Sequence, residues 1–281
     1  MRSNGQTILT DNIGYIIPIG GAEEKVRDAH ILTRFVEVAG GDQANIAIIP
    51  TASRLKDTGD RYATIFKDLG VKDAFCLSYE TRADCKRVDW LDKLSKASAV
   101  FMTGGNQLRL STLLGGTPVA DMIRERNATD NLHVAGTSAG ASIMAEHMIA
   151  YGNEGPTPRS DMVTLVPGLG LTHRAIIDQH FGQRNRLGRL MTSLAYNPRP
   201  IGIGLDEDTA AFIDHERKLT VVGSGAITIV DPGDLEFSSM DSARRHEAVC
   251  LINMRLHVLI EGCTYDMVTR VANPAPLPEL T

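Results

Sequence analysis

The sequence predicts an α/β fold, with a mostly parallel sheet flanked by helices and closed at one edge by C-terminal β-hairpins. Over the first 140 residues, short apolar runs alternate with segments whose apolar residues have helical spacing. Parallel strands need such crossover connections. After residue 200, short strand-like runs follow one another, separated by Asp, His, Gly and Lys, which is typical of hairpins.

Length and composition favour one domain. A chain of 281 residues with 43% hydrophobic residues can bury a single core, and no repeat or low-complexity linker interrupts it. We therefore expect a single α/β hydrolytic domain over residues 1–281, with loose ends at about 1–10 and 271–281.

The elements can be placed in order. In the first part we expect strands at 13–19, 46–49, 74–77 and 99–102, a further strand from residue 132, and helices at 23–38, 62–69, 88–94 and 108–114. In the second part, strand-like runs occupy 201–205, 210–213, 219–222, 226–230 and 255–260. Ligands bind at the carboxyl ends of the strands in such sheets, so the loops that follow the strands are the candidate site.

Composition excludes several classes of function. The net charge of −5 argues against general binding to nucleic acid. No stretch approaches the roughly 20 apolar residues of a membrane span, and the N-terminus does not resemble a signal peptide, so a cytoplasmic location is expected. The four cysteines have no metal-ligand spacing, and we expect neither a metal nor a cofactor.

The most informative motif is Gly136-Thr-Ser138-Ala-Gly140, which follows an apolar strand. A serine between two glycines at a strand-to-helix turn is a nucleophile elbow, because the small residues allow a sharp bend that exposes the hydroxyl. Residues 141–149 have a helical pattern, which places Glu146 and His147 on the helix after the elbow. Ser138 is therefore the predicted nucleophile of a serine hydrolase.

A serine hydroxyl needs a base, and His180 is the best candidate among eight histidines. It ends the run Ala175-Ile-Ile-Asp-Gln-His, in which apolar residues give way to polar ones as at a strand end that borders an active site. For the acid that orients the imidazole we favour Glu154, which preserves the chain order serine, acid, histidine, with Asp161 as the alternative. The amides of Ala139 and Gly105 are the expected oxyanion donors.

These residues also carry a resemblance that spans most of the chain. The segments concerned are Gly-Gly-Ala-Glu near the start, Thr-Gly-Gly-Asn-Gln-Leu at 103–108, Gly-Thr-Ser-Ala-Gly-Ala at 136–141, Pro-Gly-Leu-Gly-Leu at 167–171, and the block at 177–190. Together they resemble the cyanophycinases, from the serine peptidase family that also contains peptidase E. The resemblance implies a flavodoxin-like fold similar to class I glutamine amidotransferases.

The resemblance implies an exopeptidase that cuts cyanophycin, multi-L-arginyl-poly-L-aspartate, into β-Asp-Arg dipeptides, and it suggests a homodimer. It also implies a set of substrate-binding residues: Gln107, Asp178, Gln179, Arg184, Arg186 and Arg189. Guanidinium groups bind carboxylates through paired hydrogen bonds, which suits a chain end made of aspartate. A peptidase E-like dipeptidase acting on Asp-X peptides and a non-catalytic polymer-binding protein are the alternatives.

Overall fold

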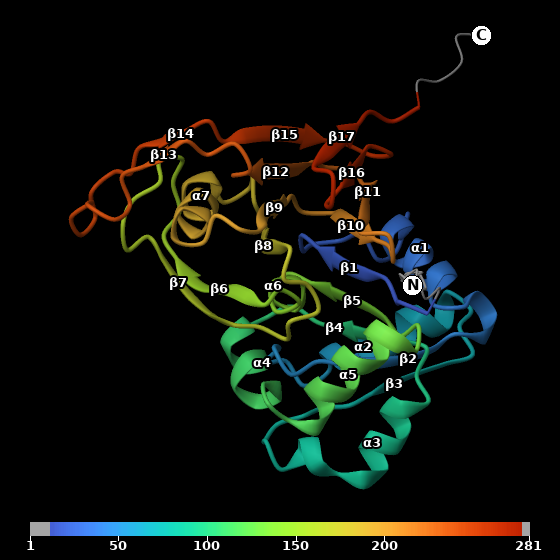
Figure 1. The fold of residues 1–281 in the computed structure, drawn as a ribbon. Coiled ribbons are helices and arrows are strands. Elements are labelled where there is room, and N and C mark those ends of the chain that lie inside the picture. Colours follow the sequence, from blue (N-terminus) through green and yellow to red (C-terminus); the bar gives the residue numbers. More distant parts are fainter. Residues whose placement is uncertain (1–11, 277–281) are drawn as a thin grey trace, which may run out of the picture.

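The structure is a computed structural model that describes residues 12–276. The expected loose ends at 1–10 and 277–281 lie outside this range. Within it, two sheets dominate the chain, one of nine strands and one of four. Figure 1 shows the nine-stranded sheet running through the molecule, with the four-stranded sheet beside it at the C-terminal end.

The large sheet has a parallel half and an antiparallel half. Its strand order is β17-β16-β11-β10-β1-β5-β4-β2-β3, and the five strands from β1 to β3 in this order are parallel to one another. The bounds are β1 Ile16–Ile19, β2 Asn45–Ile49, β3 Asp73–Cys76, β4 Ala99–Met102, β5 His133–Thr137, β10 Thr209–Ile213, β11 Lys218–Gly223, β16 Thr264–Asp266 and β17 Val271–Asn273. The predicted parallel sheet and its C-terminal antiparallel strands are confirmed.

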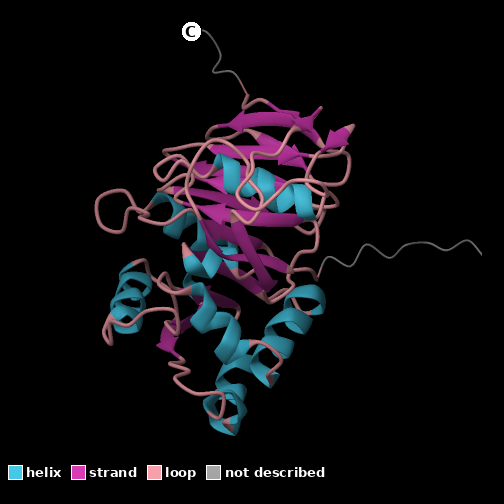
Figure 2. Cartoon of the chain, turned by 90° about the vertical axis from the view of Figure 1, so that its left-hand side faces the viewer, coloured by secondary structure: helices cyan, strands magenta, loops and turns pink. Residues whose placement is uncertain are grey.

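Helices connect the parallel strands, as expected. They are α1 His30–Val38, α2 Thr58–Asp68, α3 Val88–Ser95, α4 Gln107–Leu114 and α5 Pro118–Thr129, with 3-10 turns η1 Gly41–Gln43 and η2 Asp84–Lys86. The first helix begins at His30 rather than near Glu23, and α5 was not expected. Figure 2 shows that most helices gather around the lower part of the molecule, while the C-terminal strands form its upper part.

The four-stranded sheet corrects one expectation about connectivity. Its order is β15-β12-β9-β8, with bounds β8 Ala175–Gln179, β9 Ile201–Leu205, β12 Ile227–Asp231 and β15 Arg255–Leu259. The run at 201–205 was expected to belong to a hairpin, but β8 and β9 pair in parallel and α7, Leu187–Tyr196, connects them. A parallel pair needs this crossover, so both strands end at the same edge of their sheet.

The segment after the elbow also differs from the prediction. The helix α6 is only Ala139–Ser142, and the chain then enters β6, His147–Gly152, which forms an antiparallel hairpin with β7, Val163–Pro167. Glu146 and His147 therefore do not lie on a helix. The helical pattern was misleading because both faces of this segment are largely buried, which removes the distinction between the two periodicities.

The C-terminal strands complete the described chain. The pair β13, Phe237–Ser238, and β14, Leu251–Ile252, forms a small separate ladder. Residues 271–273 were expected in a loose tail, but they form β17 against β16. Among residues 12–276, no helix has the length and apolar character needed to cross a membrane.

Candidate active site

Ser138 lies at the sharp turn that the motif predicts. It follows β5 directly and has φ 53° and ψ −110°, a conformation that is uncommon for a residue with a side chain. The two glycines of the motif are required by close packing, because a Cβ on Gly140 would lie 2.2 Å from the carbonyl oxygen of Met102 and one on Gly136 would lie 2.5 Å from that of Gly140. The turn presents the Ser138 hydroxyl at the carboxyl end of the parallel strands.

His180 reaches Ser138 from the second sheet. It follows β8, and its Nε2 lies 2.9 Å from Oγ of Ser138. Its backbone N–H donates to the carbonyl of Gly20, 2.9 Å away, and its φ is 48°. The imidazole packs directly on Gly21, where a Cβ would lie 2.3 Å from the ring. Both Ser138 and His180 thus have a positive φ, a sparsely populated conformation that is common for residues at functional sites.

The carboxylate bonded to His180 is Glu207, and this corrects the expectation of Glu154. Oε1 of Glu207 lies 2.6 Å from Nδ1 of His180. The parallel register explains the meeting, because Gln179 of β8 is opposite Leu205 of β9, so the residues that follow each strand emerge side by side. Glu207 comes after the histidine in sequence, whereas we expected the acid between the serine and the histidine.

Neither acid proposed from the sequence lies at the imidazole. Glu154 is exposed and lines a separate hollow of about 280 Å³ with Arg159 and His246. Asp161 forms an ion pair with Arg245 at 3.3 Å. Each therefore has surroundings other than the groove that holds Ser138.

The residues around Glu207 explain why it alone faces the histidine. The carboxylate of Asp206 accepts from the N–H of Gly182, and that of Asp208 accepts from the N–H of Glu24. These two neighbours hold the turn in place through backbone hydrogen bonds. Glu207 itself keeps one carboxylate oxygen on the imidazole.

The surroundings favour a neutral imidazole. Burial lowers the pKa of His180, and the positive charges of Arg184 and Arg186 lower it further. The hydrogen bond that the imidazole donates to Glu207 raises the pKa, but the net shift remains a lowering. A base must be unprotonated to accept a proton, so this environment keeps His180 ready near neutral pH.

The Gly104–Gly105 loop and the start of α6 both adjoin Ser138. A Cβ on Gly104 would lie 3.9 Å from Oγ of Ser138, which places the Gly104–Gly105 loop directly beside this hydroxyl. Ala139 begins α6, so its N–H has no acceptor within the helix. Among the hydrogen bonds of residues 12–276, none uses the amide of Gly105 or of Ala139. These amides could therefore bind an oxyanion.

A cavity of about 350 Å³ opens in front of Ser138 and His180. Its wall includes Glu23, which the sequence analysis did not select. The Glu23 carboxylate is buried, accepts from the hydroxyl of Tyr62, and accepts from Oγ1 of Thr137 at 2.5 Å. Because Thr137 precedes Ser138, this buried carboxylate helps to hold the turn that carries Ser138.

Four of the expected substrate-binding residues form a buried ionic cluster instead of an open surface. Asp178 is fully buried and pairs with Arg189, with a 2.6 Å bond to its Nε, and with Arg186 at 3.4 Å. Gln179 accepts from Arg186 through its side chain at 2.7 Å. Arg186 and Arg189 are 6% and 4% exposed. All three guanidinium nitrogens of Arg189 donate to protein acceptors, whereas Arg186 donates through Nη1 alone and its buried Nε has no partner among the described residues.

The other two expected residues have different surroundings. Arg184 is exposed, close enough to His180 to lower its pKa, and without a side-chain partner among the described residues. Gln107 lies at the start of α4 and donates from Nε2 to the carbonyls of Ile149 and Ala150, at 3.2 and 3.0 Å. Among residues 12–276, no group of three or more His, Cys, Asp or Glu side chains could hold a metal ion.

A serine bonded to an imidazole, itself bonded to a carboxylate, on an α/β sheet defines a serine hydrolase. Comparison with known proteins makes the class more specific: residues 16–221 match the model of Peptidase family S51, and the chain belongs to that family. It is therefore a serine-type peptidase.

Several curated relatives are similar over almost the whole chain. A cyanophycinase of Geminocystis herdmanii is 42% identical over 255 residues, covering 90% of this chain and 94% of the relative. One of Thermosynechococcus vestitus is 41% identical and covers 95% and 84%, and one of Trichormus variabilis is 42% identical and covers 92% and 88%.

Solved structures show the same fold at lower identity. A peptidase from an acI-B1 Actinobacterium aligns with a TM-score of 0.67 at 20% identity, covering 92% of this chain and 98% of that one. A putative peptidase E protein from Listeria monocytogenes aligns with a TM-score of 0.53 at 17% identity and covers 76% and 100%.

Proposed function

We propose that this chain is a serine-type exopeptidase that hydrolyses cyanophycin to β-Asp-Arg dipeptides. The observation that carries the proposal is the hydrogen-bonded line from Ser138 through His180 to Glu207 in a chain about 42% identical to cyanophycinases. The similarity covers nine-tenths of the chain, so it includes every segment that contributes to this line.

The geometry suggests how the reaction proceeds. Ser138 attacks a backbone carbonyl between two aspartates while His180 accepts the hydroxyl proton, and Glu207 stabilises the imidazolium that forms. The amides of Gly105 and Ala139 bind the oxyanion. His180 then gives its proton to the leaving amine. In the second half, His180 takes a proton from water as the water attacks the acyl-enzyme; the bond between the acyl carbon and Oγ of Ser138 then breaks, His180 returns the proton to Oγ, and the acyl product leaves as a carboxylic acid.

Side chains of both signs line the cavity, Glu23 together with Lys25 and Arg61, which suits a substrate that carries both signs of charge. We propose that Arg184 binds substrate carboxylates directly, because it is exposed beside His180. For Asp178, Gln179, Arg186 and Arg189 we propose a supporting role, in which the buried cluster holds the segment that carries His180. For Gln107 we propose that its side-chain oxygen accepts from a substrate N–H, since its amide nitrogen already donates to carbonyls of β6.

The test is release of β-Asp-Arg from insoluble cyanophycin, measured by chromatography of the soluble fraction. Wild-type protein should solubilise the polymer, and Ser138→Ala should reduce the rate by about 10⁵-fold. Ser95→Ala on the distant helix α3 is the matched control and should behave as wild type. Turnover of Asp-X dipeptides without action on the polymer would instead favour a peptidase E-like enzyme. Hydrolysis of neither substrate, with binding to the polymer retained, would favour a binding protein.

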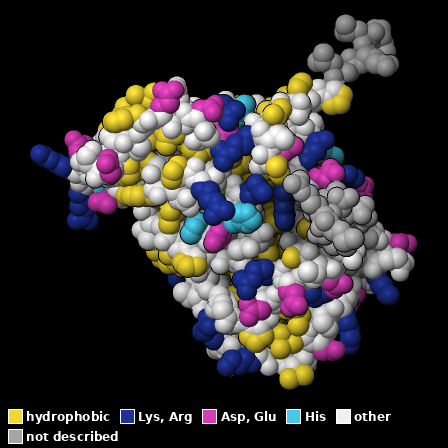
Figure 3. All heavy atoms as spheres, viewed as in Figure 1, with side chains coloured by type: hydrophobic (Ala, Val, Ile, Leu, Met, Phe, Trp, Pro, Cys, Tyr) yellow, Lys and Arg dark blue, Asp and Glu magenta, His cyan; other side chains and the backbone are white. Residues whose placement is uncertain are grey.

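We also infer a cytoplasmic homodimer built from one domain. A shared core supports the single domain, because one apolar cluster joins residues of both sheets, such as Ile49 and Ile229. The exposed Leu256, Val258 and Ile260 at edge strand β15 support self-association. Figure 3 shows hydrophobic side chains along the upper edge of the molecule, where Figure 1 places the C-terminal strands. Light scattering should give twice the chain mass, and Val258→Lys should shift it toward one chain.

A further inference from the structure

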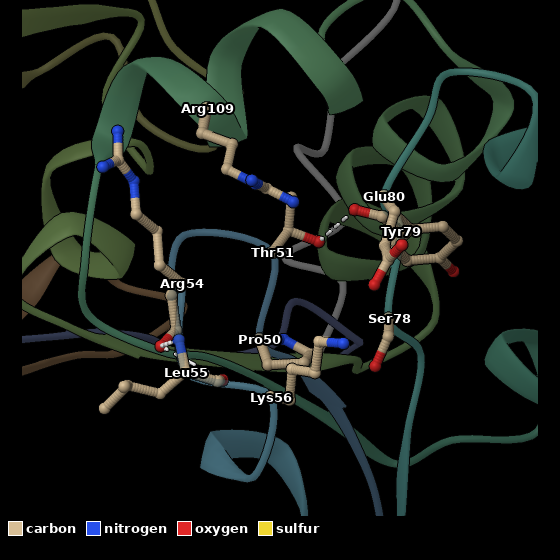
Figure 4. A pocket seen from close by; sticks show the side chains of 10 residues that line it. Pro50, Thr51, Arg54, Leu55, Lys56, Ser78, Tyr79, Glu80 and Arg109 are labelled. Atoms are coloured by element: carbon tan, nitrogen blue, oxygen red, sulfur yellow. Dashed lines mark hydrogen bonds between the residues drawn. The ribbon is translucent and has the colours of Figure 1, made fainter.

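A second cavity adjoins the one that holds Ser138. It has a volume of about 450 Å³ and is formed by the loop after β2, by residues 78–80 after β3, and by Arg109 of α4, as Figure 4 shows. Ser53 and Leu55 line both cavities, so the two are neighbours along the same edge of the sheet. Asn106 donates its N–H to the carbonyl of Ala52 at 2.9 Å, which ties this loop to the one beside the nucleophile.

The second cavity is strongly basic. Arg54, Lys56 and Arg109 line it, with Glu80 as the one acidic side chain among its lining residues. Within the described residues, none of these three cations has a side-chain hydrogen bond or ion pair. On exposed helices of the same chain, by contrast, Arg34 pairs with Glu37 and Lys96 with Asp92.

Arg109 gives the clearest sign of a missing ligand. Its Nε is buried and has no hydrogen-bond partner. A buried charged donor without an acceptor is costly, and such groups in native proteins are usually satisfied by a partner. The side chain extends from α4 over Thr51, toward the space between the two loops (Figure 4).

The position matches the path of an extended polymer. In the sheet order β5-β4-β2-β3, two to three strand spacings separate the strand of Ser138 from the strands below this cavity, which amounts to about 10–14 Å. Three or four residues of extended chain cover that distance. A polymer with its scissile bond at Ser138 therefore reaches this cavity with a unit a few residues away.

We propose that this cavity is a distal substrate subsite that binds the arginine-bearing side chain of a remote polymer unit. In the polymer, each arginine is joined through its amino group, so it keeps a free carboxylate and a guanidinium. Arg54, Lys56 and Arg109 bind the carboxylate, and Glu80 binds the guanidinium. The inference rests on the proposed function, because it assumes a polymer of such units.

The test compares oligomers of two to six β-Asp-Arg units as substrates. In the wild type, kcat/KM should rise by about tenfold or more between two and five units. The Arg54→Gln/Arg109→Gln double variant should lose most of that rise. Arg34→Gln/Lys96→Gln removes the same charge far from both cavities and should keep it. An equal loss on all lengths, or an undiminished rise in the double variant, would overturn the subsite.

Binding keeps the subsite testable apart from catalysis. In a Ser138→Ala background, calorimetry should show that the five-unit oligomer binds at least tenfold more weakly when Arg54 and Lys56, both exposed, are replaced by Gln. Poly-aspartate without arginine should compete poorly, because it lacks the guanidinium that Glu80 binds. If the wild type fails to cleave the polymer but this difference persists, the proposed function falls and the subsite stands; unchanged binding sinks the subsite alone.

Discussion

Two groups of charged side chains begin within two residues of each other at the end of β8, and they differ in which side chains remain available to a substrate. Asp178 enters a buried cluster in which its carboxylate is used by Arg186 and Arg189. His180 is hydrogen-bonded to Glu207 on one side and to Ser138 on the other, and Ser138 is partly exposed to the cavity. The comparison shows that charged residues close to Ser138 can either stabilise the fold or remain available for the reaction. Which of the two applies depends on their hydrogen-bond partners.

Glu207→Gln tests the reactive side of the comparison and should have the largest effect. The amide keeps the shape but cannot stabilise the imidazolium, so kcat should fall by about 10⁴-fold while the melting temperature changes little. Glu154→Gln is the matched control and should retain wild-type activity. Full activity in Glu207→Gln, or a comparable loss in Glu154→Gln, would indicate that Glu154 and not Glu207 orients His180.

Asp178→Asn tests the rigid side. Two buried guanidinium groups would lose their counter-charge, which costs about 3–5 kcal/mol of unfolding free energy and should lower the melting temperature by about 10 °C. Asp92→Asn, which breaks an exposed pair with Lys96, should cost less than about 1 kcal/mol. Calorimetric melting measures both. If Asp178→Asn melts like the control but no longer binds polymer, the cluster is a substrate-binding surface after all.

Glu23→Gln tests a residue that shares features with both groups, the buried cluster of Asp178 and the hydrogen-bonded line of His180. It is buried like Asp178 but bonded to the residue before the nucleophile, so we expect kcat to fall by about tenfold with KM close to that of the wild type. Tyr62→Phe removes one of its donors and leaves the bond to Thr137, so its kcat should fall less. A change in KM alone would show that Glu23 contacts substrate rather than positioning Ser138.

Arg184→Gln should have the smallest effect of the four variants on kcat/KM at its pH plateau, a loss of about threefold. It should also change the pH dependence of kcat/KM in a diagnostic way. The positive charge of Arg184 lowers the pKa of His180, so its removal raises that pKa. Activity requires neutral His180, and the acidic limb of the kcat/KM profile should therefore move to higher pH. Arg34→Gln, remote from the site, should leave the limb in place; an acidic limb that moves to lower pH contradicts this electrostatic account.

Much of the fold and the first two members of the site could be predicted from the sequence, because their signals are local. Five consecutive residues predict the turn at Ser138. The change from apolar to polar residues at the end of β8 indicates His180. Glu207 was missed because its position depends on pairing between strands. The run at 201–205 suggested a hairpin, and only the parallel register with β8 brings the following residues next to the histidine.

The same limit explains the substrate-binding residues. A sequence of closely spaced arginines shows positive charge but does not show which acceptors are already bonded. Arg186 and Arg189 are turned inward because both pair with Asp178, which precedes them in the chain and is buried in the same interior. A useful signal was present, since α7 follows at once with apolar residues at helical spacing, which makes inward-facing arginines on that helix candidates for an internal ion pair.

The crossover between β8 and β9 has a consequence for synthesis of the protein. A ribosome makes the chain from its N-terminus, so the hydroxyl of Ser138 and the imidazole of His180 emerge before the carboxylate of Glu207. The first strand also receives its neighbour β10 only after that point. A nascent chain that stops short of residue 207 contains the serine and the histidine but no carboxylate for Nδ1 of the imidazole, so the three side chains can be joined by hydrogen bonds only after translation has passed the β9–β10 turn.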